Sequence, residues 1–189
     1  MKKKVIVLLA EGFEEVEAVT PVDYLCRAGA DVTIASVGDS LIVKGARSGI
    51  SITADVLLAN VEMDGWDAVV IPGGMPGAAN LAESKEAAHL IKKMAAAEKL
   101  ICAICASPVV VLAPLGLLKG KRFTCYYGSD EIAGRIDCEG SLWTCDRVAE
   151  DGNLITSRAA GTAGEFSIAI IRALFGEEMS RKIAESILL

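Results

Sequence analysis

Short apolar runs recur along the chain, separated by longer segments of mixed polarity. Residues 5–10, 68–71 and 100–104 are unbroken apolar runs, and residues 31–35 form a fourth run that includes polar positions. An unbroken run of this length is typical of a strand buried on both faces of a parallel sheet. The pattern therefore predicts four core strands.

The mixed segments predict helices at residues 14–28, 84–98, 161–175 and 177–188, and a short helix from Cys105 to about residue 113. Gly29 follows the first helix and Ser84 begins the second, and these residue types are preferred at the C′ and N-cap positions. Pro21 lies inside the first helix, where we expect it to kink the helix or to restart it with Thr20 as the cap.

Weaker signals predict one or two short strands within residues 41–53 and further strands at residues 123–127, 144–148 and 154–156. Asp151-Gly152 predicts a turn between the last two strands. The alternation of strands and helices indicates one α/β domain, residues 1–189. We expect a three-layer sandwich, with helices on both faces of a mostly parallel sheet.

Composition narrows the classes of function. The net charge of −6 over 189 residues argues against binding to a nucleic-acid backbone, which needs a basic face. Six cysteines are too few for a disulfide scaffold, and the single histidine, His89, excludes a His-rich metal site. The run 5–10 is too short for a signal peptide, and the charge-free stretch 100–118 is interrupted by prolines. We expect a reduced cytoplasmic protein without a membrane segment.

Three predicted core strands end in residues that carry chemistry. Glu17 follows the first strand, Gly73-Gly74 the third, and Cys105 the fourth. Ligands of open α/β sheets bind beyond the carboxyl ends of the strands, so these groups meet in one crevice if the strands are neighbours. The helix after Cys105 would favour its thiolate. A buried structural cysteine fits position 105 equally well, and a plain tight turn fits Gly73-Gly74 equally well.

Other candidate motifs fit the sequence less well. Cys102 and Cys105 have the spacing of a redox pair, but strand alternation would put their side chains on opposite faces. Glu14 and Glu15 are interpreted as acids that complement the helix dipole. The remaining cysteines show no metal-ligand spacing: Cys26, Cys125, Cys138 and Cys145. We therefore expect no metal and no cofactor.

Four motifs occur in a specific order: AEGFEEVE at residues 10–17, VIPGG at 70–74, AICASP at 103–108 and TSRAAGT at 156–162. Together they resemble the ThiJ/PfpI superfamily, and within it the branch of the parkinsonism-associated protein deglycase (DJ-one). The resemblance extends from about residue 4 to residue 188. It implies a flavodoxin-like sandwich and a homodimer.

The resemblance also implies roles for individual residues. Cys105 corresponds to a reactive cysteine on a strained elbow, and Glu17 to a protonated acid that is hydrogen-bonded to its sulfur. The backbone donors of an oxyanion site correspond to Gly73, Gly74 and Ala106. Two arginines near the pocket and the dimer seam correspond to Arg47 and Arg158.

The resemblance implies conversion of glyoxal, methylglyoxal or early glycation adducts without a cofactor. The alternative is a redox sensor or chaperone that signals through oxidation of Cys105. Two departures stand out: Tyr126 replaces a pocket histidine of several relatives, and Ala160 replaces a proline. Because no histidine is available as a base, the sequence argues against peptidase activity and leaves Glu17 as the proton carrier.

Overall fold

The computed structural model describes residues 2–128 and 140–189. Seven strands form its central sheet, in the order β10 (Val148–Asp151), β11 (Leu154–Ser157), β7 (Leu100–Ile104), β6 (Ala68–Ile71), β1 (Lys4–Ala10), β2 (Asp31–Val37) and β5 (Val56–Leu57). Neighbouring strands are parallel, except that β10 and β11 are antiparallel. Two small strand pairs lie outside this sheet: β3 (Ile42–Lys44) with β4 (Ser51–Thr53), and β8 (Arg122–Phe123) with β9 (Leu142–Trp143).

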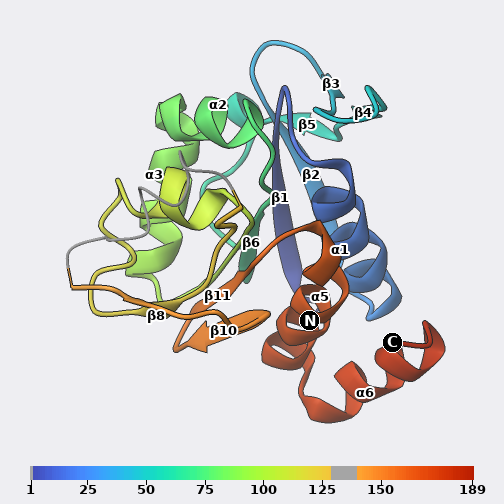
Figure 1. Cartoon of the computed structure of the whole chain (residues 1–189). Helices are drawn as coiled ribbons and strands as arrows, with labels where there is room; N and C mark the ends of the chain where they lie inside the picture. Colours follow the sequence, from blue (N-terminus) through green and yellow to red (C-terminus); the bar gives the residue numbers. More distant parts are fainter. Residues whose placement is uncertain (1, 129–139) are drawn as a thin grey trace.

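Helices cover both faces of the sheet (Figure 1). One face carries α1 (Glu15–Arg27), α5 (Ala163–Phe175) and α6 (Glu177–Ser186). The other carries α2 (Gly77–Glu83), α3 (Lys85–Ala96) and the short π-helix η2 (Pro108–Leu112). The described residues also include two 3-10 turns, η1 (Leu58–Asn60) and η3 (Ala160–Thr162). The predicted fold class is confirmed: this is a flavodoxin-like α/β sandwich.

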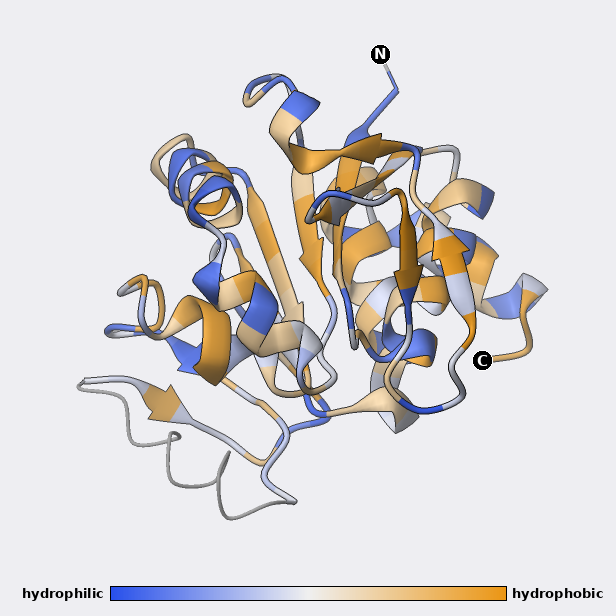
Figure 2. Cartoon of the chain, turned by 90° about the horizontal axis from the view of Figure 1, so that it is seen from above, coloured by the Kyte–Doolittle hydropathy of each residue, from blue (hydrophilic) through white to orange (hydrophobic). Residues whose placement is uncertain are grey.

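The alternation of side chains along β1 explains why the sheet needs two helical layers. Ile6 and Leu8 pack into the core under α2 and α3, whereas Val5 and Val7 pack into the core under α1 and α5. A strand with apolar residues at every position buries both of its faces, which stabilises the sheet only when both are covered. Figure 2 shows the apolar residues gathered in the central strands.

Two predicted helix ends are confirmed. Ser84 caps α3 by accepting a hydrogen bond from the N–H of Ala87, and Gly29 follows α1 with a φ of 87°. The expected restart at Pro21 is wrong, because α1 continues through this residue. Helix α2 was not predicted, since glycine and proline precede it. It forms because Ala78 and Leu81 bury their side chains in the core.

The strand predicted at residues 123–127 is much shorter in the structure, and the one predicted at residues 144–148 is wrong, because residues 144–147 lie between β9 and β10. After Phe123, the N–H of Thr124 donates to the Thr156 hydroxyl, and the N–H of Tyr126 donates to the carbonyl of Cys105. These donors therefore leave the strand ladder. Near residue 144, the Thr144 hydroxyl accepts from the N–H of Asp146, a local turn that competes with strand pairing.

Strands β7, β6 and β1 are neighbours in the sheet, as the predicted crevice requires. The chain adds β2 on one side of β1 and β6 on the other, so the carboxyl end of β1 lies at a topological switch point. Within the described residues, no helix combines the length and the apolar character that a membrane span requires.

Candidate active site

Cys105 lies directly after β7 in a strained backbone conformation. Its φ is 65°, a value that favours glycine and costs a cysteine about 1–3 kcal/mol. Neighbouring chain segments hold this conformation from both sides. The N–H of Cys105 donates to the carbonyl of Ser157 over 2.9 Å, and its carbonyl accepts from the N–H of Tyr126 over 2.8 Å. The predicted sharp turn at Cys105 is therefore confirmed.

Glu17 is the buried acid of the site. It lies on the first turn of α1 and is only 1% exposed. Its Oε2 atom accepts from the N–H of Gly73 over 2.9 Å, whereas Oε1 has no hydrogen-bond partner within the described residues. Burial, with a smaller contribution from the charge of Glu14, raises the pKa of Glu17 to about 8. The neutral carboxylic acid is therefore the main form of Glu17 at pH 7.

This arrangement corrects the expected role of Gly73. Its N–H is bound to Glu17 and is not free to hold a substrate oxyanion. The glycine is required for another reason: a Cβ here would lie 2.6 Å from the Cβ of Cys105 and 2.7 Å from Oε2 of Glu17. Gly73 thus lets the acid and the thiol approach each other.

The thiol of Cys105 does not ionise as readily as its position before a helix suggests. Burial, followed by the neighbouring Glu17, raises the pKa of Cys105, while the N–H groups of Gly74 and Ala106 lower it through hydrogen bonds to the sulfur. The predicted effect of the helix start is present but is outweighed by desolvation. Repulsion from Glu17 acts only when that carboxyl is charged, so at pH 7 burial is the main obstacle to ionisation.

A cavity of about 360 Å³ opens beside these groups. Six predicted site residues line it: Glu17, Arg47, Gly74, Cys105, Ala106 and Tyr126. Four further lining residues were missed: Glu14, Met75, Ala159 and Ala160. Glu14 could have been found, because residues three apart share one face of a helix and Glu17 was already a candidate. The alanines and Met75 carry no chemical signal of their own, although each lies in or next to a site motif.

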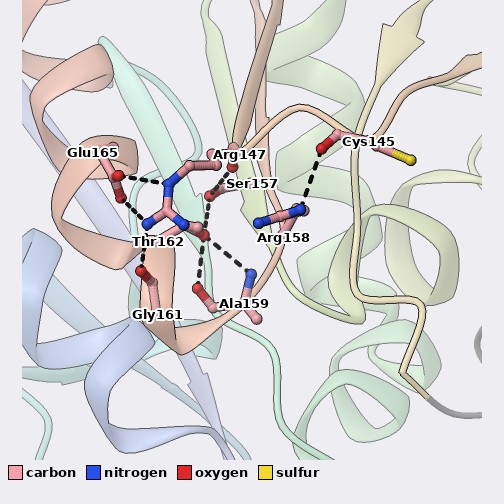
Figure 3. Close-up of polar contacts among 8 residues, drawn as sticks. All are labelled: Cys145, Arg147, Ser157, Arg158, Ala159, Gly161, Thr162 and Glu165. Carbon is pink, nitrogen blue, oxygen red and sulfur yellow. Dashed lines mark hydrogen bonds and ion pairs between the residues drawn. The ribbon is translucent and has the colours of Figure 1, made fainter.

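Arg158 is not among the residues that line this cavity, contrary to the sequence prediction. Its guanidinium donates to the Tyr127 hydroxyl and to the carbonyl of Cys145, each over 3.3 Å. Figure 3 shows Arg158 turned toward Cys145. The residue follows β11 directly, and these two bonds direct its side chain toward the β8 and β9 region instead.

A hydroxyl network shapes the loop that carries Ala159 and Ala160 (Figure 3). The hydroxyls of Ser157 and Thr162 lie 2.6 Å apart, and Thr162 also accepts from the N–H of Ala159 over 3.2 Å and donates to its carbonyl over 2.8 Å. The backbone of Ala160 lowers the pKa of Glu17, against the larger effect of burial. The loop therefore contributes to the environment of the acid as well as to the cavity wall.

An ion pair supports the outside of the same loop. Arg147 donates to both carboxylate oxygens of Glu165, over 2.7 and 3.0 Å, and to the carbonyl of Gly161 over 2.8 Å. Both charged side chains are substantially exposed, so the pair contributes little to stability on its own.

The other cysteines lie in different environments. Cys102 is fully buried, and burial raises its pKa well above the ordinary value. Cys102 belongs to the apolar cluster against which Cys105 packs, so the expectation of opposite faces is wrong. The reason is that β7 ends at Ile104, and the alternation of side chains does not extend to Cys105. Cys26 and Cys145 are exposed. Cys138 lies outside the described residues. No three His, Cys, Asp or Glu side chains of the described ranges gather as a metal site.

Comparison with known proteins identifies the family to which this site is similar. The DJ-1/PfpI family pattern matches residues 3–173. The chain is 42% identical over 186 residues to Protein DJ-1 homolog A of Arabidopsis thaliana, covering 98% of this chain but 46% of that protein. It thus spans less than half of this relative. It is 34% identical over 188 residues to the glutathione-independent glyoxalase DJR-1.2 of Caenorhabditis elegans, covering 100% of this chain and 97% of that protein.

Solved structures agree with the match. The crystal structure of Drosophila melanogaster DJ-1beta superposes with a TM-score of 0.91 at 38% identity, covering 100% of this chain and 99% of that one. A structure of Toxoplasma gondii DJ-1 in an oxidized form gives a TM-score of 0.89 at 40% identity, covering 98% of each chain.

Proposed function

Because the chain belongs to the DJ-1/PfpI family, we propose that it is a cysteine-dependent glyoxalase that acts on glyoxal, methylglyoxal or their early glycation adducts without a cofactor. One observation carries the proposal: a buried carboxyl, Glu17, keeps its proton at neutral pH next to the strained Cys105. The similarity to a protein named as a glutathione-independent glyoxalase supports the same reaction.

The reaction begins with the sulfur of Cys105 and the aldehyde carbon of methylglyoxal. The form of the pair that reacts has one proton, with a thiolate on Cys105 and a carboxylic acid on Glu17. Burial makes this the minor form at pH 7. The thiolate forms a C–S bond to the aldehyde carbon, and the C=O double bond opens to an alkoxide. The N–H groups of Gly74 and Ala106, directed at the sulfur, are placed to stabilise this oxyanion. Glu17 then gives its proton to the alkoxide, which yields a hemithioacetal and a carboxylate.

The carboxylate now acts as a base. It removes the hydrogen of the former aldehyde carbon, and the electron pair forms an enediolate. Glu17 returns that proton to the adjacent carbon, and the hydroxyl proton moves from the first oxygen to the second. The first carbon is oxidised and the second is reduced, so no external electron acceptor is needed. A carboxyl with a pKa of about 8 suits both transfers, because acid and base forms are both accessible near neutral pH.

The product of this step is a thioester of lactate on Cys105. Water adds to its carbonyl carbon, the C–S bond breaks, and lactate leaves with release of one proton to solvent. The thiolate and the protonated Glu17 are thereby restored.

The test is methylglyoxal consumption and lactate formation by the pure protein, compared with Cys105→Ser. Serine is nearly isosteric, so the variant should stay folded by circular dichroism and lose its turnover. Cys145→Ser, at an exposed cysteine, is the matched control and should keep wild-type turnover. An inactive wild-type protein would exclude the glyoxalase, and an active Cys105→Ser variant would exclude the hemithioacetal route.

A second candidate function, redox sensing, is supported by the similarity to the oxidized Toxoplasma gondii structure. In that case two peroxide molecules would convert the Cys105 thiolate to a sulfinate and form two waters. Peptide mass spectrometry after limiting peroxide should find two added oxygen atoms on Cys105 before Cys26 or Cys145. Earlier oxidation of an exposed cysteine would argue against a sensor at this site.

A further inference from the structure

We propose that Arg47 makes the cavity selective for α-oxo aldehydes that carry an anionic group, a carboxylate or a phosphate, a few atoms from the reacting carbonyl. The inference rests on the proposed function and names its substrate class. It starts from a guanidinium that lines the same cavity as Cys105.

The segment that carries Arg47 is fastened to the start of α1. Oε1 of Glu15 accepts from the N–H of Arg47 over 3.2 Å and from both the N–H and the hydroxyl of Ser48 over 2.8 Å. The N–H of Ala46 donates to the carbonyl of Phe13 over 2.8 Å. Glu15 is only 8% exposed. These bonds hold the backbone of Arg47 against the turn that leads to Glu17. The position from which the Arg47 side chain extends is therefore fixed relative to the cavity.

The side chain of Arg47 has no hydrogen bond or ion pair with any described residue. The other described arginines mostly have such partners: Arg27, Arg122, Arg147, Arg158 and Arg172. Arg181 also has none and is exposed like Arg47, but it lies on α6 and does not line the cavity. Arg47 therefore combines a guanidinium without a partner in the described residues with a position on the wall of the cavity that Cys105 also lines.

A guanidinium binds a carboxylate or a phosphate through two parallel hydrogen bonds, whereas a neutral ketone or aldehyde offers only a single acceptor. Methylglyoxal is neutral and would leave most of the hydrogen-bond donors of the Arg47 guanidinium unused. Glu17 is uncharged at pH 7 and does not repel an anion. Glu14 does oppose one, but its Oε2 atom accepts from the N–H of Glu17 over 2.8 Å at the start of α1. An anionic group should therefore bind at Arg47 and away from Glu14.

The test compares dioxovalerate, an α-oxo aldehyde with a terminal carboxylate, with its neutral methyl ester. In the wild type, kcat/KM should be about tenfold higher for the acid, the usual strength of one charge-assisted contact. Arg47→Gln should reduce this ratio to about one, and Arg47→Lys should retain part of it. Arg181→Gln is the matched control and should leave the ratio unchanged. Both substrates undergo the same chemistry, so the ratio reports on the anionic group and not on the chemical step. Glu14→Gln removes the opposing charge and should raise the ratio.

A binding measurement separates this inference from the proposed function. Hydroxyglutarate is the product expected from dioxovalerate. In the wild type it should protect Cys105 from iodoacetamide better than its dimethyl ester does, and in Arg47→Gln this difference in protection should be smaller. Protection with this pattern but without turnover would support the anion site and exclude the glyoxalase. Turnover of both substrates with a ratio near one, or equal protection by acid and ester, would overturn the inference and leave the glyoxalase standing.

Discussion

The N–H of Gly73 donates to Oε2 of Glu17 over 2.9 Å, and this bond joins the loop after β6 to the first turn of α1. It uses one oxygen of the carboxyl and leaves Oε1 without a partner within the described residues. A buried polar atom without a partner is costly to the folded state. The position of Oε1 in the site of Cys105 points to a role in proton transfer.

Gly73→Ala should disrupt the site directly. The added methyl group would meet the Cβ of Cys105 at 2.6 Å and Oε2 of Glu17 at 2.7 Å, so the loop must shift. We expect a loss of about 1–3 kcal/mol in the free energy of unfolding, together with strongly reduced turnover. Gly161→Ala, where a Cβ would meet nothing within 4 Å, is the control. Equal urea midpoints for the two variants would contradict the packing argument.

Two substitutions of Glu17 distinguish its hydrogen bonding from its proton transfer. Glu17→Gln can still donate a hydrogen bond to the sulfur, so Cys105 should keep much of its rate of alkylation by iodoacetamide at pH 7. It cannot carry a proton, so methylglyoxal turnover should be lost. Glu17→Leu removes both the hydrogen-bond donor and the proton carrier, so it should lose turnover and also slow the alkylation of Cys105 at pH 7. Unchanged turnover in Glu17→Gln would remove this residue from the catalytic step.

The raised pKa of Glu17 predicts how stability changes with pH. Between the ordinary pKa of 4.5 and about 8, the folded protein keeps a proton that the unfolded chain releases. The resulting contribution is fully present below pH 4.5 and is lost as the pH rises toward 8, at about 1.4 kcal/mol per pH unit. Relative to Glu17→Gln, which does not titrate, the wild type should lose stability from pH 5 to pH 8.

Thermal unfolding of both proteins across that pH range measures the difference. The exposed Glu83→Gln variant is the control, because its melting temperature should run parallel to that of the wild type. A constant gap between wild type and Glu17→Gln would show that the folded protein does not hold the extra proton.

The loop beside the cavity should depend on a buried hydroxyl more than on its exposed ion pair. Thr162 is 3% exposed and bonds to Ser157 and Ala159, so Thr162→Val should cost about 1–3 kcal/mol by stranding buried partners. Glu165→Gln removes the charge that pairs with the exposed Arg147 and should cost clearly less, because solvent screens this pair. Urea unfolding compares them, and the reverse order of costs would refute this ranking.

The sequence by itself determined the core strands and most helices. Unbroken apolar runs such as residues 5–10 and 68–71 are the pattern of a strand that lies between two apolar layers. The positions of these strands therefore follow from burial alone. Cap residues such as Ser84 and Gly29 end a helix through contacts with residues close by in the sequence. Such local effects can be predicted from the sequence. The same holds for Cys105, whose place at a strand end needed no knowledge of its surroundings.

The tertiary structure decided everything that depends on segments far apart in the sequence. Glu17 is separated by 56 residues from its donor Gly73, and only their meeting commits that N–H to the acid and not to a substrate. Arg158 follows a predicted strand but bonds to Tyr127 and Cys145, so it does not line the cavity. The helix start alone would lower the pKa of Cys105, but burial raises it by more, so the net shift is upward. Desolvation is a property of the assembled core, and no local pattern of residues measures it.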